Sequence, residues 1–272
     1  MNSAIRKLAE AQKRTGSLLS AGLEPSVDYL PGRYPRTLEG YREFLTDIIE
    51  ATSDIVCAYK FNMAFFESHG WQGVRMMYEV REAIPSNAFV IADAKRGDIG
   101  STAKHYARAM FEEFGADAVT LNPLMGRDSA APFLEYEDKL SFFLVLTSNP
   151  GTGEFLLPGG LYRRIASAVA DRWNERGNCG FVVGATKPEQ MGELRAVAPN
   201  LPFLVPGIGA QGGALEQTLS AGRATGDFSG LLLHVTRGIL PHSSDEESPR
   251  HIIHKKAAQW NERIAKAAIP PQ

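Results

Sequence analysis

The stretch Phe89-Val90-Ile91-Ala92-Asp93-Ala94-Lys95-Arg96-Gly97-Asp98 is an apolar run that ends in charges of alternating sign. In a β-strand alternate residues share a face, so Asp93 and Lys95 are expected to point the same way as the apolar residues before them. Taking a carboxylate and an ammonium out of water is costly, and a purely structural strand has no use for such a pair. The stretch therefore predicts a buried strand whose carboxyl end forms part of a site.

Seven other apolar runs have the same strand character, and they alternate along the chain with helical patterns. The predicted strands cover residues 18–23, 54–60, 88–93, 116–121, 141–147, 179–184, 202–206 and 230–235. The predicted helices include residues 41–51, 74–83, 102–114, 161–176, 188–198 and 252–267. Nearly continuous apolar strands suit a covered parallel sheet, and eight strand–helix units predict an α/β fold, the closed (β/α)8 TIM barrel. A doubly wound sheet is the alternative.

The composition is that of an ordinary folded protein. The chain has 272 residues, of which 44% are hydrophobic and 22% charged, which excludes a disordered or collagen-like chain. A net charge of -2 provides no basic field for nucleic acid or membrane binding. We expect a single domain over residues 1–272, with a short N-terminal helix covering one end of the barrel.

The N-terminal segment and the cysteines bear on the compartment. The segment carries Glu10 and has no long apolar core, so it resembles neither a signal peptide nor a membrane anchor. Cys57 and Cys179 each lie inside an apolar run, as buried reduced thiols do. We therefore expect a cytoplasmic protein.

Charged residues gather at the ends of the first three predicted strands, which converge on one mouth in a barrel. They are Glu24, Lys60 with the neighbouring Asn62, and the cluster Asp93, Lys95 and Asp98. Charges of opposite sign alternate there, so a lysine can act as a proton donor while carboxylates face a substrate. A salt-bridge network that serves only stability is the alternative.

The later strand ends predict a phosphate site. The seventh strand leads into Pro206-Gly207-Ile208-Gly209-Ala210-Gln211-Gly212-Gly213, and Arg237 follows the eighth. Glycines let backbone amides approach an anion, and an arginine adds a forked donor where many barrels hold phosphate. Ser148, after the fifth strand, offers a hydroxyl that reads a planar amide or serves only its turn. The six histidines have no spacing typical of a metal site or a catalytic triad.

Together these segments resemble the orotidine 5'-monophosphate decarboxylase family, in the branch that carries the motif Asp93-Ala94-Lys95-Arg96-Gly97-Asp98. The quoted segments occur in the family's order over nearly the whole chain. The resemblance implies a TIM-barrel homodimer that converts orotidine 5'-monophosphate to uridine 5'-monophosphate and carbon dioxide. This reaction is the last step of de novo uridine monophosphate biosynthesis and uses no cofactor or metal.

The resemblance also implies catalytic roles. Lys95 protonates C6 of the pyrimidine. Asp93, together with Asp98 of the partner subunit, surrounds the scissile carboxylate. Lys60 links this charge network to the ribose.

Substrate-binding roles follow from the same resemblance. Ser148 reads the pyrimidine edge, Gln211 bridges base and phosphate, and Arg237 binds phosphate with the Gly209 region. Thr102 reaches the neighbouring site across the dimer. The remaining binding positions are Glu24, Asn62 and Pro206, and Glu24 departs from the family, which commonly has aspartate there as a ribose contact.

Two other functions are weighed against this one. A related barrel acting on a sugar phosphate would stabilise an enediolate with Mg²⁺, held by Glu24 and Asp93. A barrel without activity would only bind uridine monophosphate, although binding alone does not require a lysine and two carboxylates facing one ring carbon.

Overall fold

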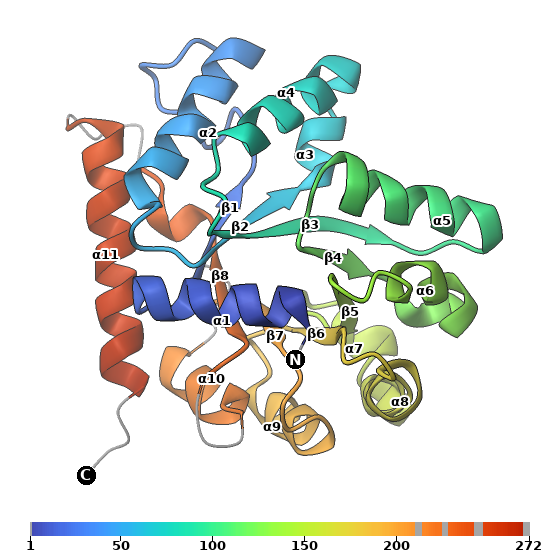
Figure 1. Ribbon diagram of the computed structural model, residues 1–272. Helices are drawn as coiled ribbons and strands as arrows, with labels where there is room; N and C mark the ends of the chain where they lie inside the picture. Colours follow the sequence, from blue (N-terminus) through green and yellow to red (C-terminus); the bar gives the residue numbers. More distant parts are fainter. Residues whose placement is uncertain (1, 210–213, 225–227, 242–246, 269–272) are drawn as a thin grey trace.

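The computed structural model describes residues 2–209, 214–224, 228–241 and 247–268, and its strands close into a single barrel (Figure 1). The strands follow one another around the barrel in the order β1 to β8, and every neighbouring pair is parallel. The predicted TIM barrel is therefore confirmed. The doubly wound alternative is excluded because β1 pairs with β8, which closes the sheet.

All eight predicted strands are present, with shifted ends. They are β1 (Leu19–Leu23), β2 (Ala58–Asn62), β3 (Phe89–Arg96), β4 (Ala118–Leu121), β5 (Leu140–Leu146), β6 (Cys179–Val183), β7 (Phe203–Pro206) and β8 (Leu231–Val235). β2 begins later than predicted because the amides of Ile55 and Val56 both donate to the carbonyl of Thr52, forming a turn. β3 continues past Asp93 and ends at Arg96, inside the charged motif.

Helices surround the strands (Figure 1). The main ones are α1 (Ser3–Thr15), α2 (Leu38–Thr52), α3 (Met63–Glu67), α4 (Gly70–Glu82), α5 (Gly100–Arg108), α6 (Arg127–Leu134), α7 (Thr152–Phe155), α8 (Leu161–Ala168), α9 (Pro188–Val197), α10 (Leu215–Gly222) and α11 (Pro249–Ala268). Helices α5 and α8 continue into π-helical segments, η1 (Ala109–Glu113) and η4 (Val169–Trp173). Short 3-10 turns are η2 (Pro123–Met125), η3 (Pro158–Gly160) and η5 (Arg237–Ile239). No helix in the described ranges is both long and apolar enough to cross a bilayer.

Helix α1 lies against the amino ends of the strands. Its buried Leu8 and Ala11 belong to the same apolar cluster as Phe89 and Phe142, which point into the barrel. The side chain of Gln12 donates to the carbonyl of Leu231, the first residue of β8, at 2.8 Å. Apolar side chains therefore fill this end of the barrel, and the carboxyl ends of the strands remain available for a site.

Candidate active site

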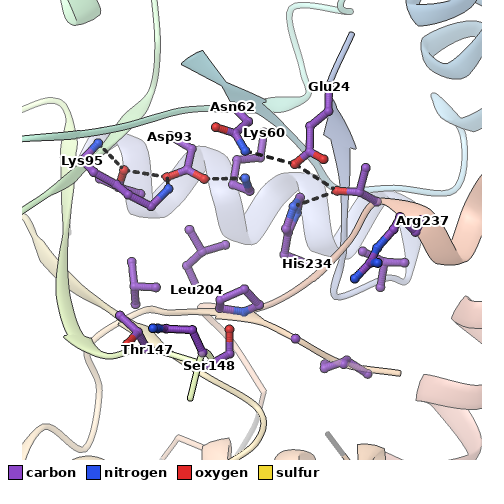
Figure 2. Close-up of a pocket in the computed structure, with 18 of the residues that line it drawn as sticks. Glu24, Lys60, Asn62, Asp93, Lys95, Thr147, Ser148, Leu204, His234 and Arg237 are labelled. Carbon is purple, nitrogen blue, oxygen red and sulfur yellow. Dashed lines mark hydrogen bonds and ion pairs between the residues drawn. The ribbon is translucent and has the colours of Figure 1, made fainter. Parts of the chain in front are cut away.

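A cavity of about 410 Å³ opens at the carboxyl ends of the strands (Figure 2). All eight strands, or the residues directly after them, contribute to its wall. This is the end of a TIM barrel where functional residues from distant parts of the chain meet. The lining includes both charged and apolar side chains, such as Asp93 and Leu204.

The carboxylate of Asp93 binds two ammonium groups. Lys60 Nζ lies 2.6 Å from Oδ2 of Asp93, and Lys95 Nζ lies 2.6 Å from Oδ1. Burial by itself would raise the pKa of Asp93, but the two lysine charges outweigh it and hold this pKa below its usual range. The side chain of Lys60 is only 5% exposed, whereas that of Lys95 is 50% exposed. Both lysines line the cavity, and Lys95 is the more exposed of the two.

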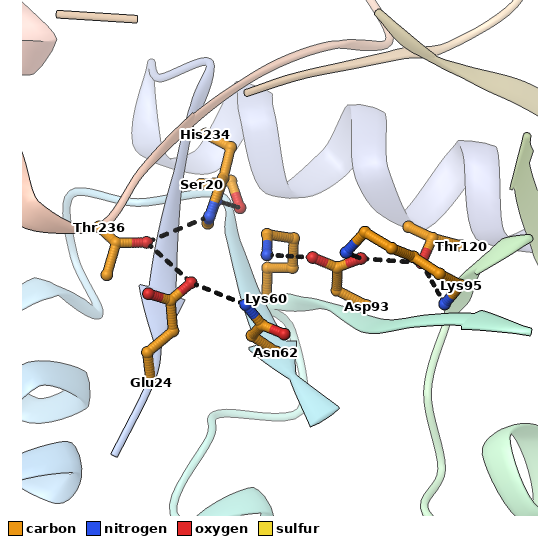
Figure 3. Close-up of polar contacts among 9 residues, drawn as sticks. All are labelled: Ser20, Glu24, Lys60, Asn62, Asp93, Lys95, Thr120, His234 and Thr236. Carbon is orange, nitrogen blue, oxygen red and sulfur yellow. Dashed lines mark hydrogen bonds and ion pairs between the residues drawn. The ribbon is translucent and has the colours of Figure 1, made fainter. Parts of the chain in front are cut away.

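Glu24 lies at the next corner of the cavity, within a chain of polar contacts (Figure 3). Its Oε1 accepts from Asn62 Nδ2 at 3.3 Å and from Thr236 Oγ1 at 3.4 Å. His234 lies behind, with one ring nitrogen 3.3 Å from Thr236 Oγ1 and the other 3.3 Å from Ser20 Oγ. Glu24 thus lines the cavity. It does so at the position where the resemblance led us to compare it with a shorter aspartate.

His234 is a buried neutral imidazole. Burial, and then the charge of Lys60, lower its pKa well below the ordinary value of 6.5. A neutral ring has one donor and one acceptor nitrogen. Because Thr236 donates to Glu24, the ring donates to Thr236 and accepts from Ser20.

Thr147 and Ser148 lie across the cavity from the Lys60–Asp93–Lys95 network (Figure 2). The hydroxyl of Thr186 donates to the carbonyl of Ser148 at 3.2 Å, which holds the turn after β5 against the loop after β6. The hydroxyl of Ser148 has no such restraint from the turn. It is available to a ligand in the cavity.

The loops after β7 and β8 form another part of the wall. Gly207, Ile208 and Arg237 line the cavity there. Gly207 and Gly209 have φ values of 95° and 73°, a region that favours glycine. A side chain at Gly209 would also meet Trp260, 3.0 Å from the ideal Cβ position. Gln211 lies outside the described residues.

Comparison with known proteins identifies the family. The profile of the "Orotidine 5'-phosphate decarboxylase / HUMPS family" matches residues 26–252. A protein of Herpetosiphon aurantiacus named orotidine 5'-phosphate decarboxylase is 47% identical over 241 residues, which are 87% of this chain and 88% of that protein. The chain belongs to this family. A Roseiflexus castenholzii orotidine 5'-phosphate decarboxylase is 45% identical over 244 residues, covering 87% of this chain and 88% of that protein.

A solved structure supports the assignment to the orotidine 5'-phosphate decarboxylase / HUMPS family. The structure of Leishmania donovani OMP decarboxylase superimposes with a TM-score of 0.85 and is 38% identical. The match covers 99% of this chain and 100% of that one. The likeness therefore extends over the entire barrel.

Most of the site residues predicted from the resemblance to this family lie together. Those that line the cavity are Glu24, Lys60, Asn62, Asp93, Lys95, Ser148, Pro206 and Arg237. Gly209 lies beside Arg237 in an adjoining hollow. The structure brings these residues together from all parts of the chain, and their individual roles stay predictions.

Asp98 and Thr102 are not part of the cavity wall. Thr102 is exposed on α5, and Asp98 accepts a hydrogen bond from the amide of Ile99 at 2.8 Å. The side chain of Ile99 is itself exposed. Neither Asp98 nor Thr102 therefore contributes to the cavity of this chain.

The lining residues that were not predicted as site residues include the polar Thr120, His234 and Thr236. Thr120 is a single polar residue in the apolar strand Ala118-Val119-Thr120-Leu121, and His234 interrupts β8 in the same way. A polar side chain inside a buried strand is the signal by which both could have been found.

Proposed function

We propose that the chain is an orotidine 5'-phosphate decarboxylase that converts orotidine 5'-monophosphate to uridine 5'-monophosphate and carbon dioxide without a cofactor, the last step of de novo uridine monophosphate biosynthesis. The proposal combines the family assignment with the chemistry of the cavity. A relative named orotidine 5'-phosphate decarboxylase that is 47% identical to this chain supports it. The proposal places the chain in the branch that carries the Asp93 to Asp98 motif.

One observation carries the proposal: a buried carboxylate in the cavity wall has an ammonium on each oxygen, and Lys95 is the more exposed of the two lysines. Loss of carbon dioxide from C6 breaks the bond between C6 and the carboxylate and leaves the electron pair in an sp² orbital. The ring cannot delocalise that pair, so an enzyme without a cofactor stabilises it electrostatically. A preorganised ammonium beside C6 does this.

Lys95 then supplies the proton. The electron pair on C6 takes a proton from Nζ, which leaves uridine 5'-monophosphate and a neutral amine that regains its proton from solvent. Asp93 and Lys60 hold Nζ in place, so little rearrangement accompanies the chemical step. Electrostatic stabilisation of the transition state is the main contribution in this mechanism.

The other polar groups of the cavity bind the remainder of the nucleotide. In this proposal Ser148 contacts the pyrimidine edge, and Glu24 and Asn62 contact ribose hydroxyls. Arg237 and the amides near Gly209 bind the phosphate, with Pro206 lining the base and Gln211 bridging base and phosphate. Binding energy gained far from C6 is available to organise the reacting groups.

We further propose that two copies of the chain form a dimer with shared sites, in which Asp98 and Thr102 reach the partner's cavity. Exposed apolar side chains lie next to these residues: Ile99 is 55%, Leu124 65% and Met125 48% exposed. The two loops that carry them are joined, because the amide of Asn122 donates to the carbonyl of Arg96 at 2.8 Å. A second copy would cover this apolar surface.

The compartment is also part of the proposal. Cys57 and Cys179 are both buried free thiols. Burial raises the pKa of each to about 12. Such thiols are unreactive, and they fit a cytoplasmic protein.

Magnesium-dependent chemistry on a sugar phosphate fits the observed contacts less well. Both oxygens of Asp93 bind lysine ammonium groups, and Thr120 Oγ1 lies 2.9 Å from Oδ1 as well. A cation would have to displace two positive charges from its principal ligand. The hydrogen-bond donors Asn62 and Thr236 likewise occupy Oε1 of Glu24.

The decisive assay follows the ultraviolet absorbance of orotidine 5'-monophosphate mixed with purified protein, with and without a chelator. We expect the absorbance to fall at the same rate in both samples. Loss of activity with chelator and its return with Mg²⁺ would favour the sugar-phosphate class. Binding of uridine 5'-monophosphate without turnover would indicate a barrel that only binds nucleotide.

A further inference from the structure

The end of β3 departs from regular strand pairing. Ala92 pairs with Val119 of β4, but the next pair is Arg96 with Leu121, so β3 has two more residues than β4 in this interval. Lys95 lies in this bulge with φ of 49°, and no other non-glycine residue in the described part of the chain has positive φ. A residue other than glycine rarely adopts this backbone conformation unless its surroundings hold it there. The strained residue is the lysine that faces the cavity.

Thr120 lies opposite the bulge, between Val119 and Leu121, and is 1% exposed. Its Oγ1 lies 2.9 Å from the backbone nitrogen of Lys95 and 2.9 Å from Oδ1 of Asp93 (Figure 3). A hydroxyl can accept one hydrogen bond while it donates another. Thr120 therefore accepts from the Lys95 amide and donates to the Asp93 carboxylate.

These contacts complete a closed ring of hydrogen bonds. Oδ1 of Asp93 also binds Nζ of Lys95, so the lysine contacts the ring through its backbone and through its side chain. The branched side chain of threonine has few rotamers, which fixes the direction of its hydroxyl. One hydroxyl on β4 thus restrains both the bulge and the carboxylate that binds the ammonium.

We propose that Thr120 is a positioning residue for decarboxylation: its hydroxyl holds the β3 bulge and thereby fixes the place of Nζ of Lys95 relative to Asp93. The proposal rests on the proposed function, in which Nζ faces C6. Thr120 acts through Lys95 and Asp93 and does not transfer a proton to the substrate.

The test compares Thr120→Val, which keeps the shape of the side chain and loses the hydroxyl, with Thr120→Ser, which keeps the hydroxyl. We expect kcat to fall about 10- to 100-fold in Thr120→Val, the size expected for lost hydrogen bonds to a charged group. The affinity for uridine 5'-monophosphate should change less than about threefold, because the phosphate and base contacts remain. Thr120→Ser should restore at least about half of kcat.

Thr52→Val is the matched control. Thr52 is fully buried, and its hydroxyl donates to the carbonyl of Ile48 at 2.7 Å, on the outer side of the barrel. This variant should lose stability without a selective loss of kcat. Equal kcat in Thr120→Val and the wild type, or equal losses in Thr120→Val and Thr120→Ser, would overturn the proposal.

Crystal structures of the variants separate this proposal from the proposed function. In Thr120→Val we expect the φ of Lys95 or the distance from Nζ to Asp93 to change, and in Thr120→Ser we expect neither to change. Should Thr120→Val fail to fold, Thr120→Ala replaces it in both measurements. If the wild type has no decarboxylase activity the proposed function fails, whereas an unchanged Lys95 in the folded variant refutes the role of Thr120 itself.

Discussion

Lys60 and Asp93 form an ion pair in which both side chains are more than nine-tenths buried, with Nζ 2.6 Å from Oδ2. Their strands are neighbours, and Asp93 pairs in register with Asn62, two residues beyond Lys60. A buried pair of this kind contributes little net stability, because desolvation of both charges opposes their attraction. Removal of one partner is a different matter, since the other charge is left behind in the interior.

Lys60→Met is therefore expected to destabilise the protein by about 3 kcal/mol and to lower turnover. Lys7→Met is the matched control, because Lys7 pairs with Asp117 at 2.7 Å but is 28% exposed. Lys7→Met should lower the free energy of unfolding by about 1 kcal/mol or less and leave kcat unchanged. Urea unfolding and steady-state kinetics measure both; equal destabilisation by the two variants would contradict the argument.

Lys95→Ala is expected to abolish turnover almost completely while the affinity for uridine 5'-monophosphate stays within about tenfold of the wild type. The reason is that Nζ acts on charge that develops only in the transition state. Isothermal calorimetry with the product and the absorbance assay give the two numbers. Retained turnover would remove Lys95 from the mechanism.

Arg237→Ala is expected to raise the KM for orotidine 5'-monophosphate by about tenfold or more, because a charge-assisted contact to phosphate is lost. Arg75→Ala serves as the control: Arg75 is exposed on α4, pairs with Glu79 at 2.9 Å, and lines neither the main cavity nor the hollow beside Gly209. Its KM should equal that of the wild type. Similar KM values for both variants would place the phosphate elsewhere.

Mixed dimers test the shared site. Lys95→Ala and Asp98→Ala proteins should each be inactive alone and regain activity after their subunits exchange, because one intact composite site forms in each mixed dimer. Subunit exchange is checked independently by differently tagged chains. No recovery after demonstrated exchange would argue against a role of Asp98 in the partner's cavity.

His234 makes stability depend on pH. Its pKa in the folded protein is well below 6.5, whereas the unfolded chain takes up a proton near that pH. The unfolded state then binds more protons, so stability should fall as the pH drops below about 6.5, by up to about 1.4 kcal/mol per pH unit. His234→Gln should lose this part of the slope between pH 6.5 and 5, and His105→Gln, at an exposed position, should keep it. Urea unfolding at several pH values measures the slopes.

The order of strands and the gathering of charges at their ends could be predicted from the sequence, because both follow from local patterns. Apolar runs identify the strands, and the barrel topology then brings Lys60, Asp93 and Arg237 to one mouth. Helix α6 was harder to predict, since it contains Pro132, a residue that usually ends or kinks a helix. Eight of the residues that line the cavity were thus predicted from the sequence.

The backbone geometry of Lys95 could not be predicted from the sequence. Strand alternation alone placed Asp93 and Lys95 on one face, but the contact between them depends on a bulge with positive φ at Lys95. That bulge is held by Thr120, which is 25 residues further along the chain and belongs to another strand. Local pattern contains no information on such a pairing, and the same holds for the contact of His234 with Ser20.

Helix α1 restricts the route by which substrate and products enter and leave the barrel. With Leu8 and Ala11 packed against Phe89 and Phe142, the far end of the barrel is plugged by hydrocarbon. The substrate then enters, and carbon dioxide and uridine 5'-monophosphate leave, through the same opening at the carboxyl ends of the strands. Carbon dioxide is small and uncharged, so we expect it to leave first, while contacts to the phosphate still hold uridine 5'-monophosphate.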